Sequence, residues 1–139
     1  MFGTSGIRGR VGTAVTADVA LSVGRAVGTE TDRVVVGRDA RETGETLQAA
    51  VTAGLRETGA AVVDVGRAAT PTVARAIAAQ DADAGIVVTA SHNPPADNGL
   101  KLWTPSGQAY PPDRQAAIEE RIETEAYDLA DWTGQGRHK

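Results

Sequence analysis

Apolar and polar residues along the chain follow two patterns, helical spacing and short uninterrupted apolar runs. Apolar positions three or four residues apart predict helices over residues 16–28, 43–58, 70–80 and 111–125. Short runs, several of them rich in valine, predict strands over residues 33–37, 61–65, 85–90 and 100–103. The glycine-rich residues 3–12 predict an exposed loop or a short strand.

Polar and glycine residues at the ends of the first helical segment indicate where that helix starts and stops. Thr16 is a candidate N-cap, because a threonine hydroxyl can accept a hydrogen bond from a free N–H group of the first turn. Gly28 is expected to end the same helix, since glycine tolerates the left-handed conformation found just past many helices.

Strands that alternate with helices of this length are typical of βαβ units, in which helices cover both faces of a parallel sheet. The pattern therefore predicts a three-layer α/β/α domain with a mostly parallel, about four-stranded sheet. A chain of 139 residues fits one domain, which we place at residues 1–132. Residues 133–139 lack apolar periodicity and are expected to form a flexible tail.

Composition and charge exclude several classes of protein. The chain has no cysteine, so it has neither a disulfide nor a thiolate metal site, and a reducing, cytoplasmic compartment is expected. Its net charge is −4, with both signs mixed along the chain, which argues against nucleic-acid binding. No apolar run approaches the roughly 20 residues of a membrane span. The first residues also lack the basic start and apolar run of a signal peptide.

Candidate chemistry is concentrated in residues 89–99, at the end of the apolar run that predicts the third strand. Ligands of open α/β sheets bind at the carboxyl ends of strands, and the prolines and glycine of this segment favour a stiff turn. Ser91 and His92 lie in this turn, and Lys101 follows on the next predicted strand. A hydroxyl, an imidazole and an ammonium brought together suit phosphoryl transfer, because the hydroxyl can carry the group while the cation neutralises developing charge.

Each of these residues also has a purely structural interpretation. Ser91 is able to shape a turn, and His92 to hydrogen-bond the loop backbone. The structural alternative for Lys101 is a solvated charge on an edge strand. Arg8 stands among nearby glycines and is either a surface residue or a phosphate-facing one.

Other interpretations of the polar residues are less favoured. A serine hydrolase lacks support, because the chain has no Gly-x-Ser-x-Gly elbow and the histidine is adjacent to the serine in sequence. Arg38 and Asp39 are expected to brace neighbouring loops rather than to contact a substrate. Asp81 and Asp83 precede the strand that leads to the serine, which places them at the opposite end of the sheet.

Three sequence motifs resemble those of one enzyme family. Residues 88–94 (Val-Thr-Ala-Ser-His-Asn-Pro), followed by residues 98–101 (Asn-Gly-Leu-Lys), are similar to the active-site serine signature of the α-D-phosphohexomutases, the phosphomannomutases and phosphoglucomutases among them. Residues 2–9 (Phe-Gly-Thr-Ser-Gly-Ile-Arg-Gly) look like the N-terminal motif of that family, and residues 36–41 (Val-Gly-Arg-Asp-Ala-Arg) resemble a third element. All three stand in the family's order, so the resemblance to its N-terminal domain I spans nearly the whole chain.

The resemblance implies a mutase that interconverts hexose 1-phosphate and hexose 6-phosphate through a phosphoserine and a bisphosphorylated sugar. It implies that Ser91 carries the phosphate and that His92 helps proton transfer. It also implies a Mg²⁺ ion bound to a phosphate oxygen of Ser91, and an activator of the glucose 1,6-bisphosphate type. The phosphate-binding residues that the resemblance implies are Thr4, Ser5, Arg8 and Lys101. The catalytic residues that it implies are Ser91, His92, Lys101 and Arg8.

Members of this family are longer chains of four domains. The resemblance implies that domains II–IV are absent here, and with them the metal loop, the sugar-reading loop and a phosphate clamp. The isolated domain is therefore expected to be inactive, and a non-catalytic domain or a truncated fragment is the alternative. The sugar stays open: mannose or glucose phosphate is the leading class, and glucosamine phosphate is the alternative. The number of subunits is open as well.

Overall fold

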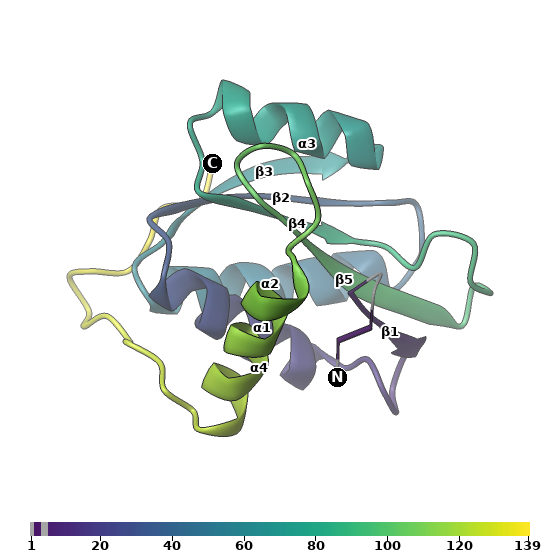
Figure 1. Ribbon diagram of the computed structural model, residues 1–139, viewed down its shortest axis with the longest axis horizontal. Helices are drawn as coiled ribbons and strands as arrows, with labels where there is room; N and C mark the ends of the chain where they lie inside the picture. Colours follow the sequence, from purple (N-terminus) through teal and green to yellow (C-terminus); the bar gives the residue numbers. More distant parts are fainter. Residues whose placement is uncertain (1, 4–5) are drawn as a thin grey trace.

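The computed structural model describes residues 2–3 and 6–139, and these residues form a three-layer α/β/α arrangement (Figure 1). Its sheet holds five strands, β1 (Ile7–Arg10), β2 (Arg33–Arg38), β3 (Ala61–Arg67), β4 (Ala84–Val88) and β5 (Asp97–Trp103). The helices are α1 (Ala17–Thr29), α2 (Gly44–Glu57), α3 (Thr70–Ala79) and α4 (Pro112–Glu123). Helices α1, α2 and α4 cover one face of the sheet, and α3 covers the other (Figure 1). Among the described residues, no helix combines the length and apolarity that a membrane span requires.

The sheet is mixed, with the strand order β1-β5-β4-β2-β3. Strands β2, β3 and β4 are parallel, whereas β5 is antiparallel to both of its neighbours, β4 and β1. The predicted α/β class and the three layers are confirmed, but the expectation of about four, mostly parallel strands is wrong. Only residues 89–96 join β4 to β5, and a parallel crossover needs a dozen or more residues. The chain therefore returns antiparallel. Strand β1 adds a fifth strand beside it, so the glycine-rich segment forms the short strand that was one of its two expected structures.

The strands at the centre of the sheet are buried on both faces. Val34 and Val36 on β2 belong to the core under α1, α2 and α4, while Val35 between them belongs to the smaller core under α3. All five residues of β4 are buried. Burial of this apolar surface, at about 25 cal/mol per Å², is the main stabilising contribution, and it fixes the strand ends from which the loops of the site depart.

Close packing of α1 on α2 explains one difference from the expected helix ends. Thr16 caps α1 as predicted, accepting a hydrogen bond from the N–H of Val19 at 3.1 Å. Gly28 does not end the helix, which continues to Thr29. A Cβ atom on Gly28 would lie 2.0 Å from Oγ1 of Thr58, so this glycine is needed for the close approach of the two helices.

The last residues of the chain pair with the edge strand β3. The N–H of Val62 donates to the carbonyl of Arg137 at 2.7 Å, and the N–H of Asp64 donates to that of Lys139 at 2.9 Å. Nε2 of His138 lies 3.2 Å from Oδ2 of Asp64. The segment that was expected to be a flexible tail thus pairs with β3, because an edge strand presents unpaired backbone groups and these residues satisfy them.

Asp64 makes the stability of this edge depend on pH. Burial by itself would raise the pKa of Asp64, but hydrogen bonds from the N–H of Gly66 and from Gln48, together with His138, bring its pKa below the usual value. A carboxyl whose pKa is lower in the folded chain stabilises the fold above its unfolded pKa, and this contribution disappears as the pH falls through the folded pKa.

We predict that Asp64→Asn loses less stability than the unmodified chain between neutral pH and about pH 3. The difference should be about 1 kcal/mol in the free energy of unfolding, below the range for a buried charged hydrogen bond because the Asp64 side chain is 29% exposed and partly screened by solvent. Urea denaturation at the two pH values measures it. Asp128→Asn, at an exposed position, is the control and should behave like the unmodified chain. Equal losses in the Asp64→Asn variant and the unmodified chain would contradict the prediction.

Candidate functional site

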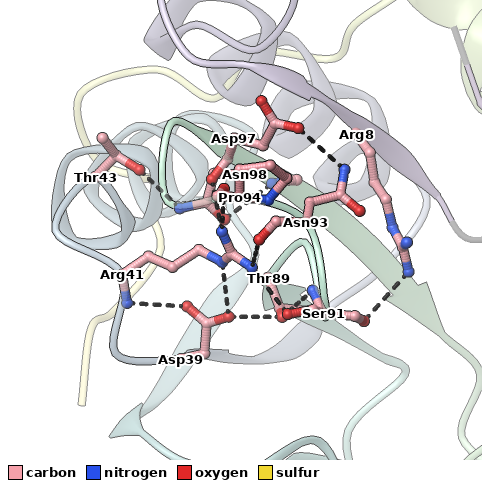
Figure 2. Close-up of polar contacts among 11 residues, drawn as sticks. Arg8, Asp39, Arg41, Thr43, Thr89, Ser91, Asn93, Pro94, Asp97 and Asn98 are labelled. Atoms are coloured by element: carbon pink, nitrogen blue, oxygen red, sulfur yellow. Dashed lines mark hydrogen bonds and ion pairs between the residues drawn. The ribbon is translucent and has the colours of Figure 1, made fainter.

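Polar side chains gather at the edge of the sheet where β4 and β2 end (Figure 2). The serine loop, residues 89–96, joins β4 to β5, and the β2–α2 loop, residues 39–43, follows β2. Because β2 and β4 are parallel, with Arg38 opposite Val88, both loops leave the same edge of the sheet. The carboxyl ends of strands are where open α/β sheets bind their ligands.

Arg8 reaches the serine loop from β1. Its Nη2 donates to Oγ of Ser91 at 3.2 Å (Figure 2). Strand β1 comes this close because Gly99, which is opposite Arg8, has no side chain: a Cβ atom there would lie 2.3 Å from the carbonyl oxygen of Ile7 and 2.8 Å from that of Thr89. Nε of Arg8 is buried and has no hydrogen-bond partner among the described residues. A guanidinium with unused donor capacity beside a hydroxyl is well placed for an anion attached to that hydroxyl.

Ser91 has an unusual backbone conformation. Its φ angle is +54°, in the left-handed region, which costs roughly 1–2 kcal/mol for a residue other than glycine. The N–H of Ser91 donates to Oγ1 of Thr89 at 3.0 Å, and the hydroxyl of Thr89 donates to Oδ2 of Asp39 at 2.7 Å. Ser91 is itself exposed, so a fixed backbone presents its hydroxyl to solvent.

Arg41 of the β2–α2 loop holds the serine loop through main-chain carbonyl groups (Figure 2). Its Nη1 and Nη2 each donate two hydrogen bonds. The accepting carbonyl oxygens and their distances are Ser91 (2.8 Å), Asn93 (2.8 Å), Pro94 (2.7 Å) and Asp97 (3.1 Å). Nε donates to Oδ2 of Asp39 at 3.3 Å. All five N–H donors of the guanidinium are therefore used within the two loops.

Amide side chains fix the base of the serine loop. Asn98 is fully buried; its Nδ2 donates to Oγ1 of Thr43 at 2.9 Å, and its Oδ1 accepts from the N–H of Gly99 at 2.9 Å. Nδ2 of Asn93 donates to Oδ2 of Asp97 at 3.1 Å. These bonds satisfy polar groups that would otherwise be costly to bury.

The structure brings two of the four predicted catalytic residues into contact. Arg8 and Ser91 share a hydrogen bond. His92, the residue that follows Ser91 in the sequence, is exposed. Lys101 has a different neighbour: its Nζ lies 5.0 Å from the centroid of the Trp103 ring, which is two residues farther from the serine loop along β5. The catalytic roles of these residues remain predictions.

Other residues selected from the sequence have mixed outcomes. Thr4 and Ser5 lie outside the described residues. Asp39 joins the β2–α2 loop to the serine loop through Thr89, so its interpretation as a brace is confirmed. The side chain of Arg38 instead bonds to helix α2, where its Nη1 donates to Oε1 of Gln48 at 2.7 Å.

The sequence analysis missed Arg41 and Thr89 as members of the site. Both stand in motifs that were recognised as family elements, Arg41 at the end of one and Thr89 within another. An aspartate and an arginine two residues apart, directly after a buried strand, can pair locally and still point donors at a neighbouring loop. That spacing was the feature of the sequence from which the contact of Arg41 with a neighbouring loop could have been predicted.

The aspartates of this domain do not form a metal site by themselves. Within the described part of the chain, no three histidine, aspartate or glutamate side chains are grouped so that they could hold a metal ion. Asp39 and Asp97 accept hydrogen bonds within the loops. Asp83 accepts from the N–H groups of Asp32 and Arg33 at the opposite end of the sheet, where the sequence analysis placed it. These residues therefore do not fit a Mg²⁺ site without further ligands.

A hollow of about 660 Å³ lies beside the two loops. Its walls are formed by Asp39, Ala40, Arg41, Glu42, Thr43, Asn93 and Pro95. Ser91 and Arg8 are not among these lining residues, so the hollow adjoins the carbonyl-binding arginine rather than the exposed hydroxyl.

Comparisons with known proteins place this geometry in a family context. Residues 1–128 match the family model described as phosphoglucomutase/phosphomannomutase, alpha/beta/alpha domain I. A probable phosphoglucosamine mutase of Thermococcus gammatolerans is 49% identical over 133 residues, and one of Pyrococcus abyssi is 47% identical over 140 residues. The crystal structure of a phosphoglucomutase/phosphomannomutase family protein from Burkholderia thailandensis superposes with a TM-score of 0.84 at 37% identity.

The chain corresponds to one part of these longer proteins. The matches cover 94% and 99% of this chain but only 30% and 31% of the Thermococcus and Pyrococcus relatives. The Burkholderia structure is matched over 97% of this chain and 32% of its own. The chain thus spans about a third of the length of the relatives it matches.

We predict that Ser91→Gly is more stable than Ser91→Ala by about 1 kcal/mol, because glycine adopts a positive φ without the Cβ clash. Urea denaturation followed by circular dichroism measures the difference. The paired control is His92, whose φ is not positive: there the glycine variant should be the less stable of the two, since glycine loses more conformational entropy on folding. If Ser91→Gly were less stable than Ser91→Ala, Ser91 would not have a left-handed backbone conformation in the folded chain.

Proposed function

The chain belongs to the phosphoglucomutase/phosphomannomutase family as its α/β/α domain I, and on this basis we propose that it carries the phosphoserine of a phosphohexomutase. The whole enzyme would interconvert hexose 1-phosphate and hexose 6-phosphate. The observation that supports this most directly is the exposed Ser91 hydroxyl, held on a braced loop with the guanidinium of Arg8 at 3.2 Å. A hydroxyl without such a cation would have no local partner for the charge of about −1.5 to −2 that a phosphate brings.

In the proposed reaction the phosphoryl group leaves Ser91 for a free hydroxyl of the sugar phosphate. The bond between phosphorus and Oγ of Ser91 breaks, a bond between phosphorus and the sugar oxygen forms, and the proton of the sugar hydroxyl is lost to a base. Arg8 donates to Oγ and so stabilises the charge that develops there as the bond breaks. His92 is our candidate for moving the proton. The bisphosphorylated sugar then returns its other phosphate to Ser91.

We also propose that the whole enzyme uses Mg²⁺, to which the phosphate on Ser91 would contribute an oxygen ligand. When bound, the ion would neutralise charge on the phosphoryl group. Because the described residues offer no grouped carboxylates, we infer that the remaining protein ligands come from the rest of the longer protein. An activator of the glucose 1,6-bisphosphate type would restore the phosphate on Ser91 when it is lost.

Glucosamine phosphate is our proposed substrate, with mannose or glucose phosphate as the alternative. The support is the name phosphoglucosamine mutase carried by the two relatives that are 49% and 47% identical. This reverses the order of the two sugar classes given in the sequence analysis. The absence of cysteine fits a reducing, cytoplasmic compartment for this activity.

A chimaeric enzyme tests the proposal. This chain replaces the matching 30% of the Thermococcus gammatolerans relative, and the chimaera is incubated with glucosamine 6-phosphate, Mg²⁺ and a hexose 1,6-bisphosphate. We predict interconversion of the two glucosamine phosphates by phosphorus NMR, with one phosphate mapped to Ser91 by mass spectrometry. Ser91→Ala should abolish both, and Ser106→Ala, at an exposed serine away from the site, should leave both unchanged. Phosphate on another serine with Ser91 bare would refute the proposal.

The contact between Arg8 and Ser91 gives a second prediction. Arg8→Ala should slow phosphate transfer to Ser91 by on the order of 10²- to 10³-fold, as expected for the loss of one electrostatic contact to the reacting oxygen. Arg10→Ala, an exposed arginine on the same strand, is the matched control and should keep the original rate. Lys101→Ala, the second cation of the proposal, should also slow transfer while lowering the free energy of unfolding by no more than about 1 kcal/mol, the size of its contact with the Trp103 ring. Quenched-flow labelling measures the rate of phosphate transfer to Ser91 in each variant. An Arg8→Ala chimaera that transfers phosphate at the original rate would count against the role of Arg8.

A further inference from the structure

One ion pair controls the main chain on both sides of the Cα atom of Ser91. On the amino side, the N–H of Ser91 is bonded to Thr89, whose hydroxyl is bonded to Asp39. On the carboxyl side, the carbonyl of Ser91 accepts from Arg41 at 2.8 Å. Asp39 and Arg41 are joined by two bonds, from Nε of Arg41 to Oδ2 at 3.3 Å and from its N–H to Oδ1 at 3.1 Å.

We propose that Asp39, Thr89 and Arg41 form a positioning clamp that holds Ser91 in its left-handed conformation and thereby keeps its Oγ in reach of Arg8. The clamp contacts no reacting atom, so its members are positioning residues. This inference deepens the proposed function, on which its catalytic consequence rests. The conformational part stands on the geometry of the unmodified chain alone.

The donor pattern explains why the clamp needs an arginine. Four carbonyl groups converge on one guanidinium, and the side chain of Arg41 is only 13% exposed. A lysine ammonium has three donors on a single atom and cannot reproduce a planar fork. Without Arg41, the shielded carbonyl groups of the loop would lose their partner, and the loop would have to rearrange to reach water.

Loss of the clamp should move Oγ of Ser91 because the left-handed conformation is intrinsically unfavourable for serine. If the two bonded peptide groups are released, the residue relaxes toward an ordinary φ, and its side chain turns away from Arg8. Displacements of about 1 Å in a reacting group can cost on the order of 10² in rate. A residue that served only the stability of the fold would not produce this effect in folded protein.

Hydrogen exchange on the unmodified 139-residue chain tests the conformational part without any phosphate. The amides of Ser91, Asn93 and Asp97 are hydrogen-bonded inside the loop region. In Arg41→Ala and Arg41→Lys we expect these amides to exchange about tenfold faster or more, equivalent to about 1.4 kcal/mol of lost protection, while those of β2 and β4 keep their rates. Arg67→Ala is the matched control, since Arg67 is an exposed arginine on the neighbouring strand end.

Phosphate transfer in the chimaera tests the catalytic part with an isosteric pair. Thr89→Val keeps the shape of the side chain but removes the hydroxyl that links Ser91 to Asp39, whereas Thr89→Ser keeps the hydroxyl. We expect Thr89→Val to slow labelling of Ser91 by on the order of 10²-fold, with an unchanged KM for the bisphosphate, and Thr89→Ser to stay close to the original rate. Added guanidinium ion should restore part of the rate to Arg41→Ala.

The outcomes separate the two proposals. Unchanged exchange in both Arg41 variants, or a Thr89→Val chimaera that labels as fast as Thr89→Ser, would overturn the clamp. If Arg41→Ala fails to fold, Arg41→Lys and the Thr89 pair carry the test. If the unsubstituted chimaera leaves Ser91 without phosphate, the proposed function fails, and faster exchange in Arg41→Lys still establishes the clamp as a conformational device.

Discussion

The short connection between β4 and β5 is the constraint on which the site depends. Residues 89–96 are too few for a crossover helix, so β5 runs back along β4 and leaves an edge to which β1 can bind. Gly99 then permits β1 to approach closely enough for Arg8 to reach Ser91. The same short connection therefore makes the sheet mixed and places β5 where β1 pairs with it and brings the guanidinium of Arg8 to the hydroxyl.

A short loop with several carbonyl groups turned inward needs internal hydrogen-bond donors, because buried backbone groups are seldom left unpaired. Arg41 supplies four of these donors from a different loop, and Asp39 balances its charge. This arrangement stores local strain at Ser91 and compensates it through bonds made elsewhere. Strain held in this manner is common at functional sites, which agrees with the role proposed for the serine on independent grounds.

The sequence predicted the elements and the position of the site better than it predicted the connections within them. Apolar periodicity located the helices and the buried strands, since burial imposes that pattern directly. The strand over β5 was predicted but its antiparallel direction was missed, although the short β4–β5 connection indicated it. The spacing of Asp39 and Arg41 indicated a local pair, but the carbonyl groups that Arg41 binds were not predictable, because every residue carries a carbonyl group whatever its identity. The pairing of residues 137–139 with β3 was missed for the same reason.

Lys101 shows how a residue can suit phosphate chemistry and yet lie elsewhere in an unphosphorylated chain. Its ammonium lies over the ring of Trp103, on the same face of β5, and such a contact contributes about 0.5–1 kcal/mol at partly exposed positions. A phosphate adds a charge of about −1.5 to −2, and a charge-assisted hydrogen bond to it is about twice as strong as a neutral one. The observed contact with the ring is thus weaker than the bond to phosphate that we propose for Lys101, so the ring would not compete strongly with the phosphate for the ammonium.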